Sequence, residues 1–193
     1  MRNTLTLLLL LAPAAAFAHA GHDLPAGGFA SGFLHPLMGL DHIAAMIAVG
    51  LWAATLGGAA VPVLLLAFPL AMIAGGILGG AGIPLPAVEA GIAASSIVIG
   101  VAVMLAARPP LWLAGAVVAA FAVFHGHAHG TEMPATGSLA PYAAGFVLAT
   151  LLLHLSGLGI GHLSRLRPGP VLLRTLGAAI ALTGSFALGG LAA

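Results

Sequence analysis

Two short stretches of this chain combine histidines with acids, at residues 35–42 (HPLMGLDH) and residues 125–132 (HGHAHGTE). Neutral imidazole binds nickel, cobalt, copper and zinc, and a nearby carboxylate helps to balance the charge of the cation. The two stretches therefore predict a metal-ligating function. The candidate ligands in them are His35, Asp41, His42, His125, His127, His129 and Glu132.

The first stretch cannot hold one ion on a straight helix. His35 and His42 are seven residues apart, so they would share a helix face but lie about 10 Å apart along its axis. Pro36 and Gly39 allow a kink or a local unwinding between them. Asp41 can bind metal itself or accept a hydrogen bond from a ligating imidazole, which fixes the tautomer. The alternative is a hydrogen-bonded structural cluster.

The second stretch has two possible geometries. In a helix, His125 and His129 share one face and Glu132 continues it. If Gly126 and Gly130 unwind the segment, alternate histidines point to opposite sides. Either form offers two or three nitrogen and oxygen ligands. The alternative is a pH-sensitive or merely hydrated outer loop.

Other ionisable residues are isolated. Glu89 stands in an apolar run, where it can be a ligand, a proton acceptor or a helix-start acid favoured by the dipole. His154 is a further candidate ligand or a packing residue, and we interpret His162 as structural. Three more candidate ligands lie near the N-terminus, on a capture site or a solvated tail: His19, His22 and Asp23.

The composition indicates that these residues belong to a membrane protein. Of 193 residues, 61% are hydrophobic and 5% are charged, whereas a soluble domain carries about 25% charged residues. The composition therefore excludes a soluble globular protein. The absence of cysteine excludes disulfides, and no basic patch supports nucleic-acid binding. We expect an all-α, polytopic transmembrane bundle in contact with lipid.

The N-terminus is typical of a secretory signal peptide. Arg2 precedes an apolar run at 5–14, and residues 16–18 form an A-x-A cleavage site. We expect a signal peptide at 1–18 and a single membrane domain at 19–193, with a periplasmic N-terminus after cleavage. An uncleaved anchor helix is the alternative.

Glycine and proline divide the mature chain into six predicted spans. Every mature arginine then falls in or next to a cytoplasmic connection, as the positive-inside rule expects. Arg108 follows the third span, and Arg165, Arg167 and Arg174 lie around the connection after the fifth. The predicted spans are near 29–56, 60–82, 86–107, 110–129, 139–162 and 170–191.

In these motifs the chain resembles the HupE/UreJ family, small membrane proteins found with hydrogenase and urease genes. The resemblance rests on the signal peptide followed by HAGHD, the 35–42 motif, Glu89 with Ser95 and Ser96, the 125–132 motif and the HLSG of 154–157. It implies a nickel permease, or in some members a cobalt permease. The metal identity comes from the resemblance alone.

We therefore expect an inner-membrane permease that imports Ni²⁺ or Co²⁺ for maturation of enzymes such as hydrogenase or urease. The ion is a transported substrate, no prosthetic group is expected, and the protein is not expected to be an enzyme. No nucleotide-binding motif is present. The alternatives are an intramembrane zinc hydrolase built on Asp41, His42, Ser96, His125 and His129, and a periplasmic-facing metal sensor or delivery protein.

Overall fold

The structure, a computed structural model, describes residues 28–132, 139–163 and 169–191. Every regular element in these ranges is helical. The elements are α2 (Phe29–Leu34), the 3₁₀ turn η2 (His35–Leu37), α3 (Leu40–Leu56), α4 (Ala60–Gly80), α5 (Val88–Met104), α6 (Leu111–Thr131), α7 (Leu139–Leu163) and α8 (Gly169–Gly190). The predicted signal peptide lies outside the described residues. So do the N-terminal candidate ligands His19, His22 and Asp23, and the arginines Arg165 and Arg167.

Four helices are long and apolar enough to cross a membrane, namely α4, α6, α7 and α8. Their bounds agree with four predicted spans to within a few residues, and α4 keeps Pro62 and Pro69 inside it. The fifth helix, α5, is apolar but has only 17 residues. The chain is therefore a multi-pass membrane protein.

The predicted first span is not one straight helix. The segment α2–η2 and α3 pass the span test together, but their axes differ by 85°. Pro36 lacks the N–H that would continue the helical ladder, and Gly39 adopts an extended backbone before α3 begins. The kink that these two residues allow is thus a sharp break.

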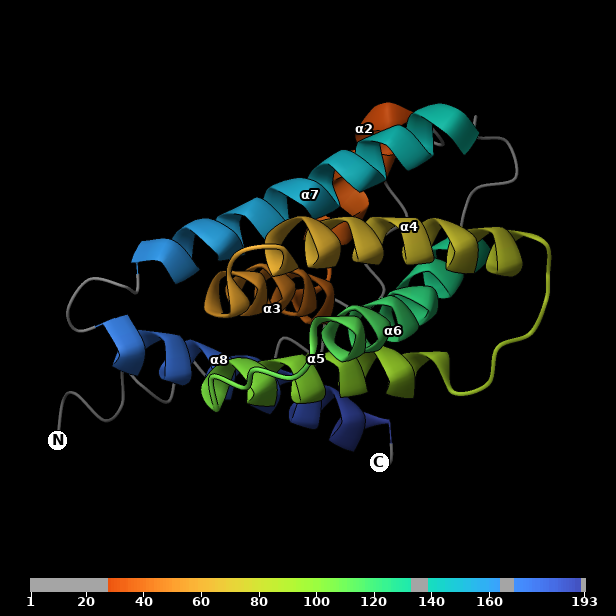
Figure 1. Ribbon diagram of the computed structural model, residues 1–193. Coiled ribbons are helices and arrows are strands. Elements are labelled where there is room, and N and C mark those ends of the chain that lie inside the picture. Colours follow the sequence, from red (N-terminus) through yellow and green to blue (C-terminus); the bar gives the residue numbers. More distant parts are fainter. Residues whose placement is uncertain (1–27, 133–138, 164–168, 192–193) are drawn as a thin grey trace, which may run out of the picture.

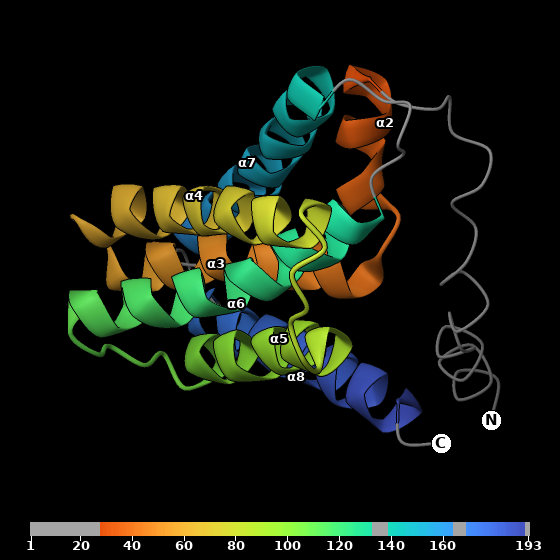
Figure 2. The ribbon, with the colours of Figure 1, turned by 90° about the vertical axis from the view of Figure 1, so that its right-hand side faces the viewer.

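Helix α3 lies at the centre of the bundle. It packs against α7 on one side and α5 on the other, while α4 and α6 pair beside it. Figures 1 and 2 show α7 and α2 on one side of this central layer and α5 with α8 on the opposite side. Most of α3 beyond its first turn is buried, which suits a helix that is apolar all round.

Glycines let the backbones of α4 and α6 meet. A Cβ on Gly126 would collide with the Met72 carbonyl, and one on Gly75 would collide with the Val123 carbonyl. Gly79 and Gly130 continue the same interface one turn further along. The G-x-x-x-G steps of α4 therefore pack closely against α6, as small residues at helix contacts in membranes allow. It also fixes how α6 is rotated about its axis.

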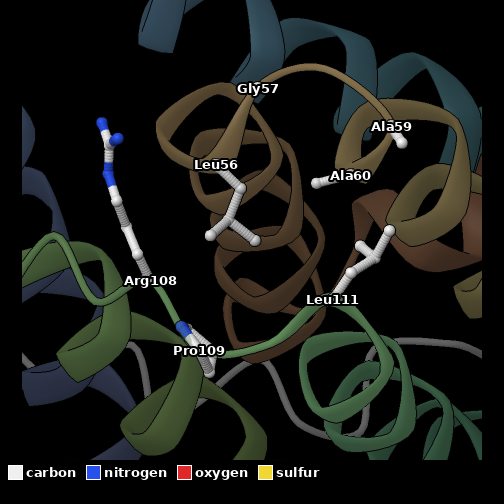
Figure 3. Close-up of a pocket in the computed structure, with 7 residues that line it drawn as sticks. All are labelled: Leu56, Gly57, Ala59, Ala60, Arg108, Pro109 and Leu111. Atoms are coloured by element: carbon white, nitrogen blue, oxygen red, sulfur yellow. The ribbon is translucent and has the colours of Figure 1, made fainter.

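The two ends of the bundle differ in charge. At one end a cavity of about 280 Å³ lies between the α3–α4 and α5–α6 connections, beside Arg108 (Figure 3). Asp41, Glu89 and Glu132 lie at the starts of α3 and α5 and at the end of α6, which form the opposite end. The described acids and Arg108 are therefore at opposite ends. The cavity is lined by Leu56, Gly57, Ala59, Ala60, Arg108, Pro109 and Leu111.

Candidate metal centre

The break before α3 places the two histidines of the first stretch around one histidine of α6. The ring centroid of His129 lies 4.7 Å from that of His35 and 4.6 Å from that of His42. On a straight helix His35 and His42 would be about 10 Å apart along the axis. The bend therefore gathers the two stretches into a single cluster.

The outer part of the cluster consists of His35, His129 and Glu132. His35 Nε2 lies 3.1 Å from Glu132 Oε2, and His129 Nδ1 lies 3.9 Å from the same oxygen. One ligand atom from each residue lies within 4.8 Å of the other two. With bonds of about 2.1 Å, ligands on opposite sides of an ion are about 4.2 Å apart. A side-chain shift of less than about 1 Å would close this triad on a metal ion.

Glu132 suits this place because it stays ionised. It lies just beyond the end of α6, and its side chain is 56% exposed. The hydrogen bond from His35 holds the pKa of the Glu132 carboxyl below its usual range, against the opposing effect of burial. The carboxylate is thus a ready charge partner for a cation at the solvent end of the cluster.

Asp41 orients His42. Asp41 Oδ1 lies 3.0 Å from His42 Nδ1 and accepts the backbone N–H of His42 at 2.9 Å. An ionised carboxylate only accepts hydrogen bonds, so Nδ1 must carry the ring proton. His42 Nε2 then has a free lone pair, and it is buried without a hydrogen-bond partner among the described residues. The expected orienting role of Asp41 fits this geometry.

Ser95 orients the ring of His125, as Asp41 orients the ring of His42. Its hydroxyl lies 2.6 Å from the carbonyl oxygen of Ile92 and 2.8 Å from His125 Nε2. Because the hydroxyl has one proton, donating it to Ile92 requires His125 Nε2–H to donate to the serine oxygen. His125 Nδ1 is then left with its lone pair, fully buried and without a partner in the described part of the chain.

The inner part of the cluster is a second triad of His42, His125 and His129. The ring of His42 lies 4.8 Å from that of His125 and 4.6 Å from that of His129. Both ring nitrogens of His129 lack hydrogen-bond partners among the described residues. Three imidazole rings from α3 and α6 therefore lie close together, and they share His129 with the outer triad.

Comparison with known proteins identifies the family of the chain. Residues 7–187 match the family model described as HupE / UreJ protein. The chain belongs to the HupE/UreJ family. Protein HupE of Rhizobium leguminosarum bv. viciae is 45% identical over 187 residues, which cover 97% of each chain. No solved structure matches. The family resemblance expected from the motifs is thus confirmed.

Not every predicted ligand of this HupE/UreJ member enters the cluster. His127 faces away, with Nε2 2.8 Å from the carbonyl oxygen of Ile83 in the α4–α5 connection. Glu89 is exposed in the first turn of α5, within electrostatic range of His42 and Glu132. His154 is fully buried further along α7.

Several aromatic residues that the sequence did not single out also line the cluster. Phe146 packs against His129 with ring centroids 4.4 Å apart, and Tyr142 lies 6.1 Å from His35. Phe68 lies 5.4 Å from His125. Aromatic residues carry no positional signal in an apolar chain. Ser95 could have been found, since a hydroxyl inside an apolar helix needs a hydrogen-bond partner.

Proposed function

We propose that this HupE/UreJ protein is an inner-membrane permease that imports Ni²⁺ or Co²⁺ for the maturation of metalloenzymes such as hydrogenase or urease. The observation that carries the proposal is the convergence of His35, His42, His125 and His129 with two carboxylates at one end of an apolar bundle. Family membership supports the metal identity. The ion is cargo, and the protein is not an enzyme.

The proposed topology has six spans after removal of a signal peptide. Helix α5 is about 26 Å long at 1.5 Å per residue, close to the roughly 30 Å of a hydrocarbon core. We count it and the bent α2–α3 pair as spans, which adds two to the four long helices. The acidic end then faces the periplasm and Arg108 faces the cytoplasm, as the positive-inside rule requires.

The ligand set suits a cation of borderline softness. Imidazole nitrogen with carboxylate oxygen favours nickel, cobalt, copper and zinc over the hard alkaline-earth ions. The inside-negative potential favours inward movement of a divalent ion by about 4.6 kcal/mol per 100 mV. Import therefore needs no ATP hydrolysis by this chain.

Uptake of radioactive nickel into cells that express the protein tests this proposal. Wild-type cells should accumulate nickel above the empty-vector level, whereas the His42→Ala variant, present in equal amount, should not. His162→Ala is a matched control, because that exposed imidazole lies next to the Leu158 carbonyl of its own helix. Equal uptake by wild type and His42→Ala would remove the central role assigned to His42.

A further inference from the structure

A phenylalanine ring contacts both a histidine of the metal cluster and another histidine further along the bundle. The Phe68 ring centroid lies 5.4 Å from that of His125 and 5.0 Å from that of His154. Its plane is nearly perpendicular to the plane of the His154 ring, at 85°. Phe68 is fully buried in α4. His154 is thus the next imidazole inward from the cluster, one aromatic ring away.

His154 has an environment that a packing residue would not need. Its side chain is fully buried, and neither ring nitrogen has a hydrogen-bond partner among the described residues. Burying a polar group without a partner costs roughly 1–3 kcal/mol. An unsatisfied buried group of this kind calls for a specific explanation, such as a bound water or ion.

Thr150 provides a second unpartnered group on the same face of α7. It precedes His154 by one helical turn, is also fully buried, and its hydroxyl has no hydrogen-bond partner in the described ranges. Tyr142 and Phe146, which line the outer cluster, precede it at the same spacing of four. One face of α7 therefore runs from the outer cluster to the two deeper polar groups.

We infer that His154 and Thr150 form an inner transfer site for the transported cation, reached from the outer cluster past the ring of Phe68. This inference rests on the proposed permease function. Conduction requires several sites, each strong enough to be entered and weak enough to be left. One imidazole and one hydroxyl bind a divalent ion more weakly than the outer triads, which suits a site that releases it inward.

The test compares binding with transport for purified protein. His154→Leu should bind nickel in detergent with an affinity within about two-fold of wild type, because the outer triads are intact. In proteoliposomes its initial rate of nickel influx should fall at least about ten-fold, on the scale of losses seen when metal-site partners are removed. Retained nickel affinity also shows that the variant is folded.

His162→Leu is the matched control, since it makes the same exchange two turns later on α7 at an exposed position. Thr150→Val removes only the hydroxyl and should lower influx by a smaller factor. If wild type moves nickel and His154→Leu moves it at the same rate, the inner site is refuted and the permease stands. If wild type moves no nickel, the permease proposal itself fails.

Discussion

The histidines on the two faces of α6 have different surroundings. His125 and His129 face α3 and meet His42, whereas His127 lies between them in sequence and contacts the carbonyl of Ile83. All three are buried. Burial of a histidine therefore does not identify a ligand here. What matters is the direction in which the ring points: His127 donates its Nε2–H to the Ile83 carbonyl and lies outside the cluster, whereas the rings of His125 and His129 lie against that of His42.

The glycines of the same segment explain this division. Gly126 and Gly130 lie against the backbone of α4, so α6 has one allowed rotation. At 100° per residue, that rotation turns His125 and His129 to the cluster and His127 away from it. The pattern of alternating histidine and glycine thus places a helix–helix contact on one face of α6 and two histidines near His42 on another.

Exchanging one histidine on each face should give the largest contrast. His129→Ala should weaken nickel binding by more than about 100-fold, since even an indirect metal-site partner accounts for 10–100-fold. His127→Ala should leave affinity within about two-fold, because its imidazole is outside the cluster. Isothermal titration of purified protein measures both. A similar loss in the two variants would erase the distinction between the faces.

Asp41→Asn should have the next largest effect. Asparagine keeps the size of the side chain but removes the negative charge that orients His42 and raises its basicity. We expect nickel affinity to fall by about 10–100-fold, measured by the same titration. An affinity equal to that of wild type would show that His42 does not depend on Asp41.

A methyl group added at the α4–α6 contact should disturb both histidine faces of α6 together. Gly126→Ala places a methyl group on the Met72 carbonyl, so the helices must separate. Overpacking of this kind costs about 1–3 kcal/mol, which thermal unfolding in detergent should detect, along with weaker nickel binding. Gly189→Ala is the control, because nothing lies within 4 Å of that position. Equal unfolding temperatures would contradict the proposed backbone contact.

Ser95→Ala should give the smallest effect. It removes one hydrogen bond to His125 and leaves the ring nitrogen buried. A loss of about 1 kcal/mol corresponds to roughly a five-fold weaker nickel affinity. Ser156→Ala is the control, since that exposed hydroxyl bonds the Leu152 carbonyl of its own helix. If Ser95→Ala matched wild type, Ser95 would have no part in orienting His125.

Much of the fold could be predicted because hydropathy and helix breakers act locally. The long helices begin and end near the expected residues for this reason. The angle at residues 35–39 could not be predicted. Proline and glycine permit a break, but the contacts of α2 with α7, such as Gly32 against Tyr142, help to set its direction.

The candidate ligands could also be named from the sequence, but not which of them lie close together. Spacing placed His125 and His129 on one helix face, and the structure puts both beside His42. The spacing could not show which way that face turns, because the rotation of α6 depends on its packing against α4. His127 entered the predicted ligand set for the same reason.

The nickel coordination shell gives the most direct test of the central claim. X-ray absorption at the nickel edge of the loaded, purified protein should show at least two imidazole ligands. His129→Ala should lose imidazole scattering, and His127→Ala should leave the spectrum unchanged. A wild-type shell made only of oxygen, or a shell altered by His127→Ala and not by His129→Ala, would contradict the metal centre described above.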